Sequence, residues 1–427
     1  MSTTTEFQDM LNEFLPNPLL KEELVKRDYV LRSCEKDESW GGGALVVPFK
    51  GAQASSLRYG GLTPSDNVAQ SKFVRGQVDG PKELWGTMIF NHRDLMDHGK
   101  ISEQNFLKLL PDEIEDFMDF TKNTVSTNFL NGAVVANTTV IANAADGLVT
   151  VDRPDKFTIG MLVQFTTVDA TLVTAYVKTI NINTQVMLLV TARDGATPVD
   201  FSASAGGKAL ASGGGLYNHG ATVAANPFAS IRDALLSAAN GGSTNLYGKA
   251  KTAWTYLQAI NIDGSAITSA NIMEKIFDAL VRVRLFGKGN PSEVLMSLTN
   301  LGHCMKVIEA QKGGFNVSPG SQKASQYGWM EIMVGSPTKG ALKLVGINEA
   351  NDDTIMFIDW RGIKFYSNGF FQKAKSPDGN EYFTIRAETG YAYLIDICLF
   401  GELVVQRPSY CGIIYGVDIP AAEGEVA

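Results

Sequence analysis

The sequence predicts an α+β protein that carries a small all-β domain as an insertion. A long, glycine-punctuated β-arm runs from Gly41 to His98, and one amphipathic helix follows it from Pro111 to about Leu130. The stretch from Ala133 to Ser212 then lacks helical periodicity and alternates strand-like segments with turns. Helical and strand-like segments alternate over the rest of the chain, which completes the prediction.

The chain begins with a helical N-terminal arm, predicted over residues 1–40. Apolar Phe7 and Leu11 are spaced as on one side of a helix that ends before Pro16. A second segment of apolar and charged residues spans Leu19 to Leu31. Two helical pieces are therefore expected ahead of the β-arm.

The β-arm is predicted to be one extended hairpin over residues 41–98. It opens with three glycines from Gly41, and turn residues from Pro64 to Asn67 separate its strand-like segments. The return segment, from Phe73 to Phe90, is interrupted at Asp79-Gly80-Pro81. Two strands alone are marginally stable in water, so a hairpin of this length is expected to lie on another surface.

The amphipathic helix is predicted to begin at Pro111, because proline suits a first helical position. Apolar residues share one side at helical spacing, and they are Ile114, Phe117, Met118 and Val125. Acidic residues share the opposite side, and they are Asp112, Glu115, Asp116 and Asp119. With a rise of about 1.5 Å per residue, this helix would be roughly 30 Å long.

The charges of the arm and of this helix are complementary. The cations of the arm are Lys50, Arg58, Lys72, Arg75 and Lys82, whereas its acids are Asp66 and Asp79. The acidic side of the helix is therefore predicted to bind the arm of another subunit. The alternative is that the acids favour the positive end of the helix dipole while the cations are solvated. That alternative explains Asp112 and Glu115 but explains Asp119 poorly, because the effect fades after one turn.

The Val-, Thr-, Ala- and Asn-rich insertion is predicted over residues 133–215, between Gly132 and Gly213-Gly214-Gly215. Its strand-like segments are Gly147 to Val151, Met161 to Thr167, Ala175 to Ile182 and Gln185 to Thr191. Their spacing indicates a small barrel or a sandwich.

The chain after the insertion again mixes helices and strands. Asn226-Pro227 is a good helix start, and a further helix is predicted from Ala270 to Phe286. A buried strand from Ser292 to Ser297 and a helix from Asn300 to Gln311 follow.

The order of these segments resembles the major capsid protein of tailed bacteriophages, whose shell fold is shared with encapsulins and the herpesvirus capsid floor. The resemblance is carried by the glycine-rich arm, Phe90-Asn91-His92-Arg93-Asp94-Leu95, the acidic helix, the strand-helix module Val294 to Ala310, and Phe400-Gly401-Glu402-Leu403. It implies that residues 41–98 form the extended loop and residues 99–132 the spine helix with the start of the peripheral domain. It further implies that residues 216–290 continue the peripheral domain, 291–395 form the axial domain, and 396–427 return to the peripheral domain.

The resemblance implies a structural protein of the virion rather than an enzyme. Such a protein self-assembles through hexamers and pentamers, in the host cytoplasm, into an icosahedral capsid around double-stranded DNA. Its implied partners are further copies of itself, a portal, a decoration protein and a scaffolding protein. Little chain precedes the arm, so the scaffold is separate or a precursor has been trimmed, and the initiator Met1 favours a separate scaffold.

Two alternatives remain open. An encapsulin-type nanocompartment shell protein shares the fold but normally carries no large insertion. A multidomain glycan-binding protein or hydrolase would explain the β insertion, but it would need an aromatic platform or paired carboxylates. The aromatic residues of the insertion are Phe157, Phe165, Tyr176 and Phe201, and its acids are not clustered.

Composition indicates a large folded protein with no membrane segment. The chain has 427 residues, of which 44% are hydrophobic and 19% charged, so more than one domain is expected. No apolar run approaches the roughly 18 residues of a membrane helix, and residues 1–9 do not resemble a signal peptide. A net charge of -8 argues against a basic face that grips nucleic acid. DNA would therefore be enclosed without sequence-specific binding.

Motifs for catalysis, metals and cofactors are not found. Cys34, Cys304, Cys398 and Cys411 are widely separated and predict neither a zinc site nor a disulfide framework. His303 and Cys304 are neighbours on a predicted helix, where their side chains diverge by about 100°, so a packed cysteine and a surface histidine are expected. Covalent crosslinking through Lys50, Lys72 or Lys82 would depend on geometry rather than on residue type.

Overall fold

The computed structural model describes residues 3–52, 72–78, 80–91, 96–97, 100–101, 103–132, 134–140, 147–151, 154–157, 159–166, 172–192, 195–201, 215–218, 228–310, 329–335, 341–375, 379–387 and 390–419. The fold mixes helices and sheets, as predicted. Two compact units divide it: residues 1–122 with 231–427 form the first, and residues 123–230 form the second. No helix in the described ranges is both long enough and apolar enough to cross a membrane.

The N-terminal arm is helical, as predicted. It consists of α1 (Thr3–Phe14), α2 (Asn17–Arg27) and α3 (Tyr29–Ser33), followed by β1 (Glu35–Asp37). Asp28 separates α2 from α3 because its side chain accepts a hydrogen bond of 2.6 Å from the Leu31 N–H, which caps α3. Asn17 accepts a hydrogen bond from the Lys373 N–H at 3.0 Å and so ties α2 to the sheet described below.

The β-arm forms a shorter hairpin than predicted. Strands β2 (Leu45–Ala52) and β3 (Lys72–Val78) pair antiparallel, with Leu45 opposite Val78. The predicted return segment is divided, because β4 (Lys82–Asn91) leaves the hairpin and pairs with β23. Gly80 and Pro81 interrupt the ladder at this point, since proline has no N–H to donate. Strands β5 (Met96–Asp97) and β6 (Lys100–Ile101) follow.

The acidic helix is α5 (Glu103–Asn131), and it starts earlier than predicted. Pro111 lies inside it rather than at its first position. The residues ahead of Pro111 are mostly good helix formers, so one hydrogen bond lost at the proline does not end the helix. The predicted apolar side is confirmed, since Met118 and Val125 are fully buried, and Ile114 and Phe117 are half-buried.

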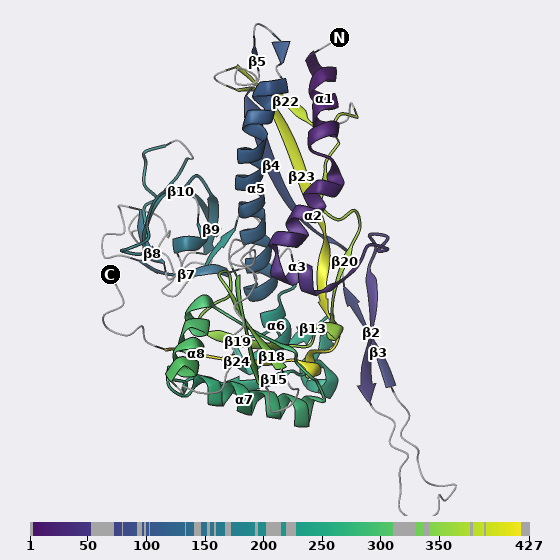
Figure 1. The fold of residues 1–427 in the computed structure, drawn as a ribbon, viewed down its shortest axis with the longest axis vertical. Helices are drawn as coiled ribbons and strands as arrows, with labels where there is room; N and C mark the ends of the chain where they lie inside the picture. Colours follow the sequence, from purple (N-terminus) through teal and green to yellow (C-terminus); the bar gives the residue numbers. More distant parts are fainter. Residues whose placement is uncertain are drawn as a thin grey trace, which may run out of the picture. The chain divides into compact units, whose positions relative to one another are not determined.

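A six-stranded sheet is built around β23 (Gly390–Val405), its longest strand (Figure 1). Strand β4 pairs with it antiparallel from Asn91 opposite Ala392 to Lys82 opposite Gly401. The other neighbours of β23 are β22 (Phe383–Ala387), β21 (Gln372–Lys373) and β20 (Ile363–Ser367), and β1 pairs in parallel with β20.

A second six-stranded sheet has the order β15-β24-β19-β16-β18-β17. Its strands are β15 (Ile260–Asp263), β16 (Glu293–Met296), β17 (Trp329–Gly335), β18 (Ala341–Ile347), β19 (Thr354–Ile358) and β24 (Gly412–Tyr415). The helices α7 (Ile272–Arg282) and α8 (Leu298–Ala310) pack on one face, where Ile276, Leu301 and Phe357 share a core (Figure 1). Helix α6 (Ile231–Leu235) precedes the sheet, and a π-helical turn (Val283–Gly287) continues α7.

These two sheets do not follow the predicted domain limits. Strand β15, before residue 291, and strand β24, after residue 396, both belong to the second sheet, with β24 parallel to β15. Residues 363–405 instead join β4 in the first sheet. Sequence order could not reveal this arrangement, because strands adjacent in a mixed sheet need not be adjacent in the chain.

The insertion is a closed barrel with strand order β10-β11-β8-β7-β12-β9. Its strands are β7 (Val134–Val140), β8 (Leu148–Val151), β9 (Leu162–Thr166), β10 (Leu172–Asn181), β11 (Val186–Val190) and β12 (Gly215–Asn218). A barrel was one of the two predicted architectures, and the four central strands lie where alternation placed them. Closure also needs β7 and β12, and β12 extends past the predicted limit at residue 215.

The remaining elements are short. They are the 3-10 turns η2 (Pro154–Lys156), η4 (Ala238–Asn240), η5 (Lys251–Ala253), η6 (Thr255–Leu257), η8 (Trp360–Gly362) and η9 (Pro408–Tyr410), and the strands β13 (Asn245–Leu246) and β14 (Lys249–Ala250).

Candidate assembly surface

The hairpin of β2 and β3 is anchored by one face to Tyr247. The Phe49 ring stacks on the Tyr247 ring at a centroid distance of 5.6 Å, and Phe49 is 2% exposed. The Gln77 N–H donates to the Tyr247 carbonyl at 3.1 Å, and the Tyr247 hydroxyl accepts from the Val405 N–H at 2.8 Å. Gly76 lacks a side chain where a Cβ would lie 2.4 Å from the Phe49 ring. The root of the hairpin is therefore closely packed on its own chain.

The other face of the hairpin is open. Val46 is 56% exposed, and Pro48, Arg75 and Gln77 are exposed beside it. Figure 1 shows β2 and β3 projecting from β20 and the first sheet. Residues 53–71, which include Arg58, lie outside the described residues. The described part of the arm thus packs on its own chain by one face and leaves the other face open. Its predicted contact with the acidic helix of another subunit stays a prediction.

The predicted cations do not all lie on this hairpin. Arg75 lies on β3, opposite Pro48, and is exposed. Lys50 and Lys72 belong to β2 and β3, but their side chains lie outside the described part of the structure. Lys82 is the first residue of β4 and therefore belongs to the first sheet instead.

The predicted acids share the open side of α5. Glu115, Asp116 and Asp119 are exposed, whereas the Asp112 side chain is outside the described residues. Asp119 already has a partner within the chain, because the Arg27 Nη1 of α2 lies 2.5 Å from its Oδ1. Among the described residues, Glu115 and Asp116 have no such salt bridge, so they remain the candidates for the predicted contact. The helix dipole explained Asp119 poorly, whereas the salt bridge with Arg27 gives this acid a role within the chain.

The opposite side of α5 fastens the helix to the first sheet. The Phe117 ring covers Gly86 of β4, where an added Cβ would lie 2.7 Å from a ring carbon, and it stacks on Phe371 at 6.4 Å. One turn further, Lys122 forms a buried salt bridge of 2.5 Å with Glu349. Removing either partner of such a pair would leave an uncompensated buried charge. The salt bridge therefore favours the orientation in which α5 brings Lys122 to Glu349.

The outer face of the first sheet exposes apolar side chains that were not singled out from the sequence. Trp85 and Ile89 of β4 are 52% and 41% exposed. The Trp85 ring meets the half-buried Phe400 ring edge-on at 5.7 Å. The alternation of Glu83, Trp85, Thr87 and Ile89 was the available signal, but residues of both parities are apolar in this strand. Its outer face was identified only once β23 was known as its partner.

No catalytic centre is found among the described residues. Cys304 is fully buried on α8, and burial raises the pKa of its thiol to about 12, so a thiolate nucleophile is not available near neutral pH. His303 is 7% exposed, so the prediction of a surface histidine is wrong. The described part of the chain also holds no group of three or more His, Cys, Asp or Glu side chains that could bind a metal.

The described aromatic residues of the predicted insertion give no support to a glycan site. Phe157, Phe165 and Phe201 are at most 5% exposed and belong to the barrel core. Tyr176 is half-buried on β10. Aromatic rings that fill a core cannot serve as a stacking platform for sugars.

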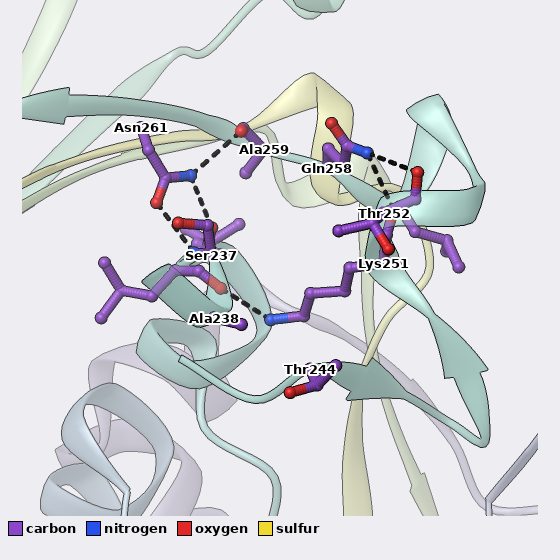
Figure 2. A pocket seen from close by; sticks show the side chains of 11 residues that line it. Ser237, Ala238, Thr244, Lys251, Thr252, Gln258, Ala259 and Asn261 are labelled. Atoms are coloured by element: carbon purple, nitrogen blue, oxygen red, sulfur yellow. Dashed lines mark hydrogen bonds between the residues drawn. The ribbon is translucent and has the colours of Figure 1, made fainter. Parts of the chain in front are cut away.

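A pocket between α6 and η6 is lined by polar groups that the chain itself uses (Figure 2). The Lys251 Nζ donates to the Asp233 carbonyl at 2.5 Å and to the Leu236 carbonyl at 2.7 Å. The Asn261 amide donates to the Leu235 carbonyl at 2.9 Å and accepts from the Ser237 N–H at 2.9 Å. These side chains donate hydrogen bonds to the carbonyls at the end of α6, so we interpret the pocket as part of the packing of this helix end rather than as a ligand site.

Comparison with solved structures finds proteins of capsids and of an encapsulin that match nearly the whole length of this chain. The cyanophage A-1(L) capsid asymmetric unit matches 92% of this chain and 92% of its own, with 12% identity and a TM-score of 0.49. The capsid of a native GTA particle matches 91% of this chain and 90% of its own, with 10% identity and a TM-score of 0.45. The chain is similar to capsid proteins.

A further match is the holo-SrpI encapsulin complex from Synechococcus elongatus PCC 7942, which covers 92% of this chain and 88% of its own, with 10% identity and a TM-score of 0.41. In sequence, the chain matches no family model and no curated protein. At such identities the likeness concerns the fold alone.

Proposed function

We propose that this protein is the structural subunit of an icosahedral shell that encloses the double-stranded DNA of a tailed phage. The observation that carries the proposal is the hairpin, which is rooted on Tyr247 by one face and leaves Val46 and Arg75 open on the other. A projecting two-stranded hairpin gains stability when a neighbour covers its open face. The hairpin and its receiving surface differ, so the contact is heterologous, and repeated copies close when the contact angle permits.

The acidic side of α5 is the proposed receiving surface of the neighbour. Arg75 supplies a described cation, and Lys50, Arg58 and Lys72 belong to the same arm. Glu115 and Asp116 are two of the exposed acids of α5, and the half-exposed Phe120 lies beside them. Exposed ion pairs are individually weak, so the contact depends on many copies acting together at high effective concentration.

The proposal also covers the building blocks of the shell, its cargo, its partners and its location. Hexamers and pentamers would be its building blocks, and a net charge of -8 suits a container that holds DNA without binding its sequence. A separate scaffolding protein, a portal and a decoration protein are its proposed partners. Assembly would take place in the host cytoplasm, and the mature location would be the virion.

The test replaces Gln53 to Ser71 with a short Gly/Ser turn. Ala52 and Lys72 are register partners, so a tight turn can close the ladder without disturbing the Tyr247 root. We expect a folded, soluble subunit that forms no closed shells in electron microscopy, whereas the unaltered chain forms them. Normal shells from the shortened chain would contradict the role of the arm. Nucleic acid inside purified particles, rather than protein cargo, would distinguish the phage capsid from an encapsulin-type shell.

A further inference from the structure

Helix α7 and its π-helical turn expose an apolar strip with opposite charges at its two ends. Val281, Leu285 and Phe286 are 37%, 67% and 73% exposed. The exposed acids Glu274 and Asp278 lie toward the start of α7, and the exposed cations Arg282 and Arg284 lie toward its end. Scattered apolar residues are common on surfaces, but an apolar cluster rimmed by charges marks an interaction site.

The exposed Leu285 and Phe286 lie on the π-helical turn. Gly287 allows the turn to pack closely on η9, because a Cβ at this position would lie 2.0 Å from the Ser409 carbonyl oxygen. The exposed pair is thus presented by a packed backbone.

The charges on this strip have no internal use in the described structure. Across its described residues, Glu274, Asp278, Arg282 and Arg284 form no salt bridge. The acids fall at i and i+4, followed by Val281, Arg282 and Leu285 along the same stripe. A surface with acid at one end, cation at the other and apolar groups between them is complementary to itself.

We propose that this strip binds the same strip on a second copy of this chain, with the two α7 helices antiparallel about a two-fold axis at Val281. A parallel arrangement would place like charges together, whereas the antiparallel one places Asp278 against Arg282 and Arg284 twice. The same register brings Leu285 onto the half-buried Phe277 of the other copy. The contact uses no residue of the hairpin.

The contact is small, and this determines how it acts. One helix and one turn bury much less than the roughly 1,600 Å² of a standard interface. The pairing is therefore weak between isolated chains and becomes effective when other contacts already bring copies together. It deepens the proposed shell function by giving each subunit a second self-contact, of two-fold type.

Cysteine crosslinking tests the two-fold register. All four native cysteines are buried, so Val281→Cys introduces an exposed thiol that meets its own copy only at a two-fold axis. We expect mild oxidation of the full chain to give at least about ten times more disulfide-linked dimer for Val281→Cys than for Met330→Cys, which lies on β17 at a side chain 41% exposed. Equal yields from both variants, or no dimer from either, would overturn the proposal.

Charge reversal tests the partner assignment. In the Val281→Cys background, Asp278→Arg alone and Arg282→Asp alone should each reduce the dimer yield several-fold, because each sets like charges together twice. Mixing these two variants should restore it, since the mixed pair has complementary ends. Failure of the mixture to recover would refute the antiparallel pairing. Unchanged thermal melting of each variant shows that these exposed substitutions leave the fold intact.

The hairpin-shortened chain separates this inference from the proposed function. If that chain forms no shells but still crosslinks through Val281→Cys at high concentration, both proposals hold. Shells from the unaltered chain, together with no disulfide-linked dimer from Val281→Cys, would retain the shell function and reject the α7 contact. If Val281→Cys crosslinks but the unaltered chain forms no shells, the α7 contact is retained and the shell function is rejected.

Discussion

At the scale of the residue, Phe117 shows how one side chain joins two elements. Its ring covers Gly86 of β4 and stacks on Phe371, yet it remains half-buried. Phe117→Ala should therefore cost about 2 kcal/mol of unfolding free energy, less than the roughly 3 to 5 kcal/mol of a fully buried ring. Asp116→Lys is the matched control on the open side of α5, and it should leave the stability of the monomer nearly unchanged while impairing assembly. Denaturant melts of both variants measure this, and equal losses would contradict a two-sided helix.

Lys251 gives a prediction with a defined pH window. Burial lowers the pKa of its amine from 10.5 to about 8. Between about pH 8 and 10.5 the unfolded chain binds a proton that the folded chain has released, so the free energy of unfolding rises with pH. Lys251→Met loses this rise, although it also leaves the Asp233 and Leu236 carbonyls without their donor at every pH. Melts of both proteins across this window check the difference, and parallel curves would show that the amine keeps its ordinary pKa.

At the scale of the element, the barrel determines where the chain can be cut. Its strands run from Val134 to Asn218, and its core of Val149, Phe165 and their neighbours belongs to the second compact unit. Removing Val134 to Asn218 with a Gly/Ser link should leave a first unit that melts cooperatively, since the cores of its two sheets lie elsewhere in the chain. Circular dichroism and thermal melting test this.

A shorter deletion, from Thr138 to Ala211, is the informative comparison. It follows the turn signals of the sequence but leaves part of β7 and all of β12 without β8 and β9. Unpaired strand edges favour association with other chains. We expect that product to aggregate more than the longer deletion, and the opposite ranking would show that the barrel strands support the first unit.

At the scale of the whole molecule, the chain exposes several surfaces that it does not cover itself. The open hairpin face, the acidic side of α5, the outer face at Trp85 and the α7 strip are each exposed while their opposite sides are packed. The shortened hairpin should abolish shells and the α7 variants should weaken one contact, so the two sets of variants should differ in the size of the products. Analytical ultracentrifugation separates single subunits from capsomers and shells.

The sequence by itself determined the element types and their sidedness. Alternation predicted the strands of the barrel, helical spacing predicted the buried side at Met118, and the glycine-rich arm predicted a hairpin. Each of these is a local pattern, readable within a few turns or one strand. The tertiary structure alone decided that β4 leaves the hairpin for β23, that β24 lies beside β15, and that Asp119 pairs with Arg27. Those choices depend on which distant surfaces bury most together, and no short stretch of sequence records that competition.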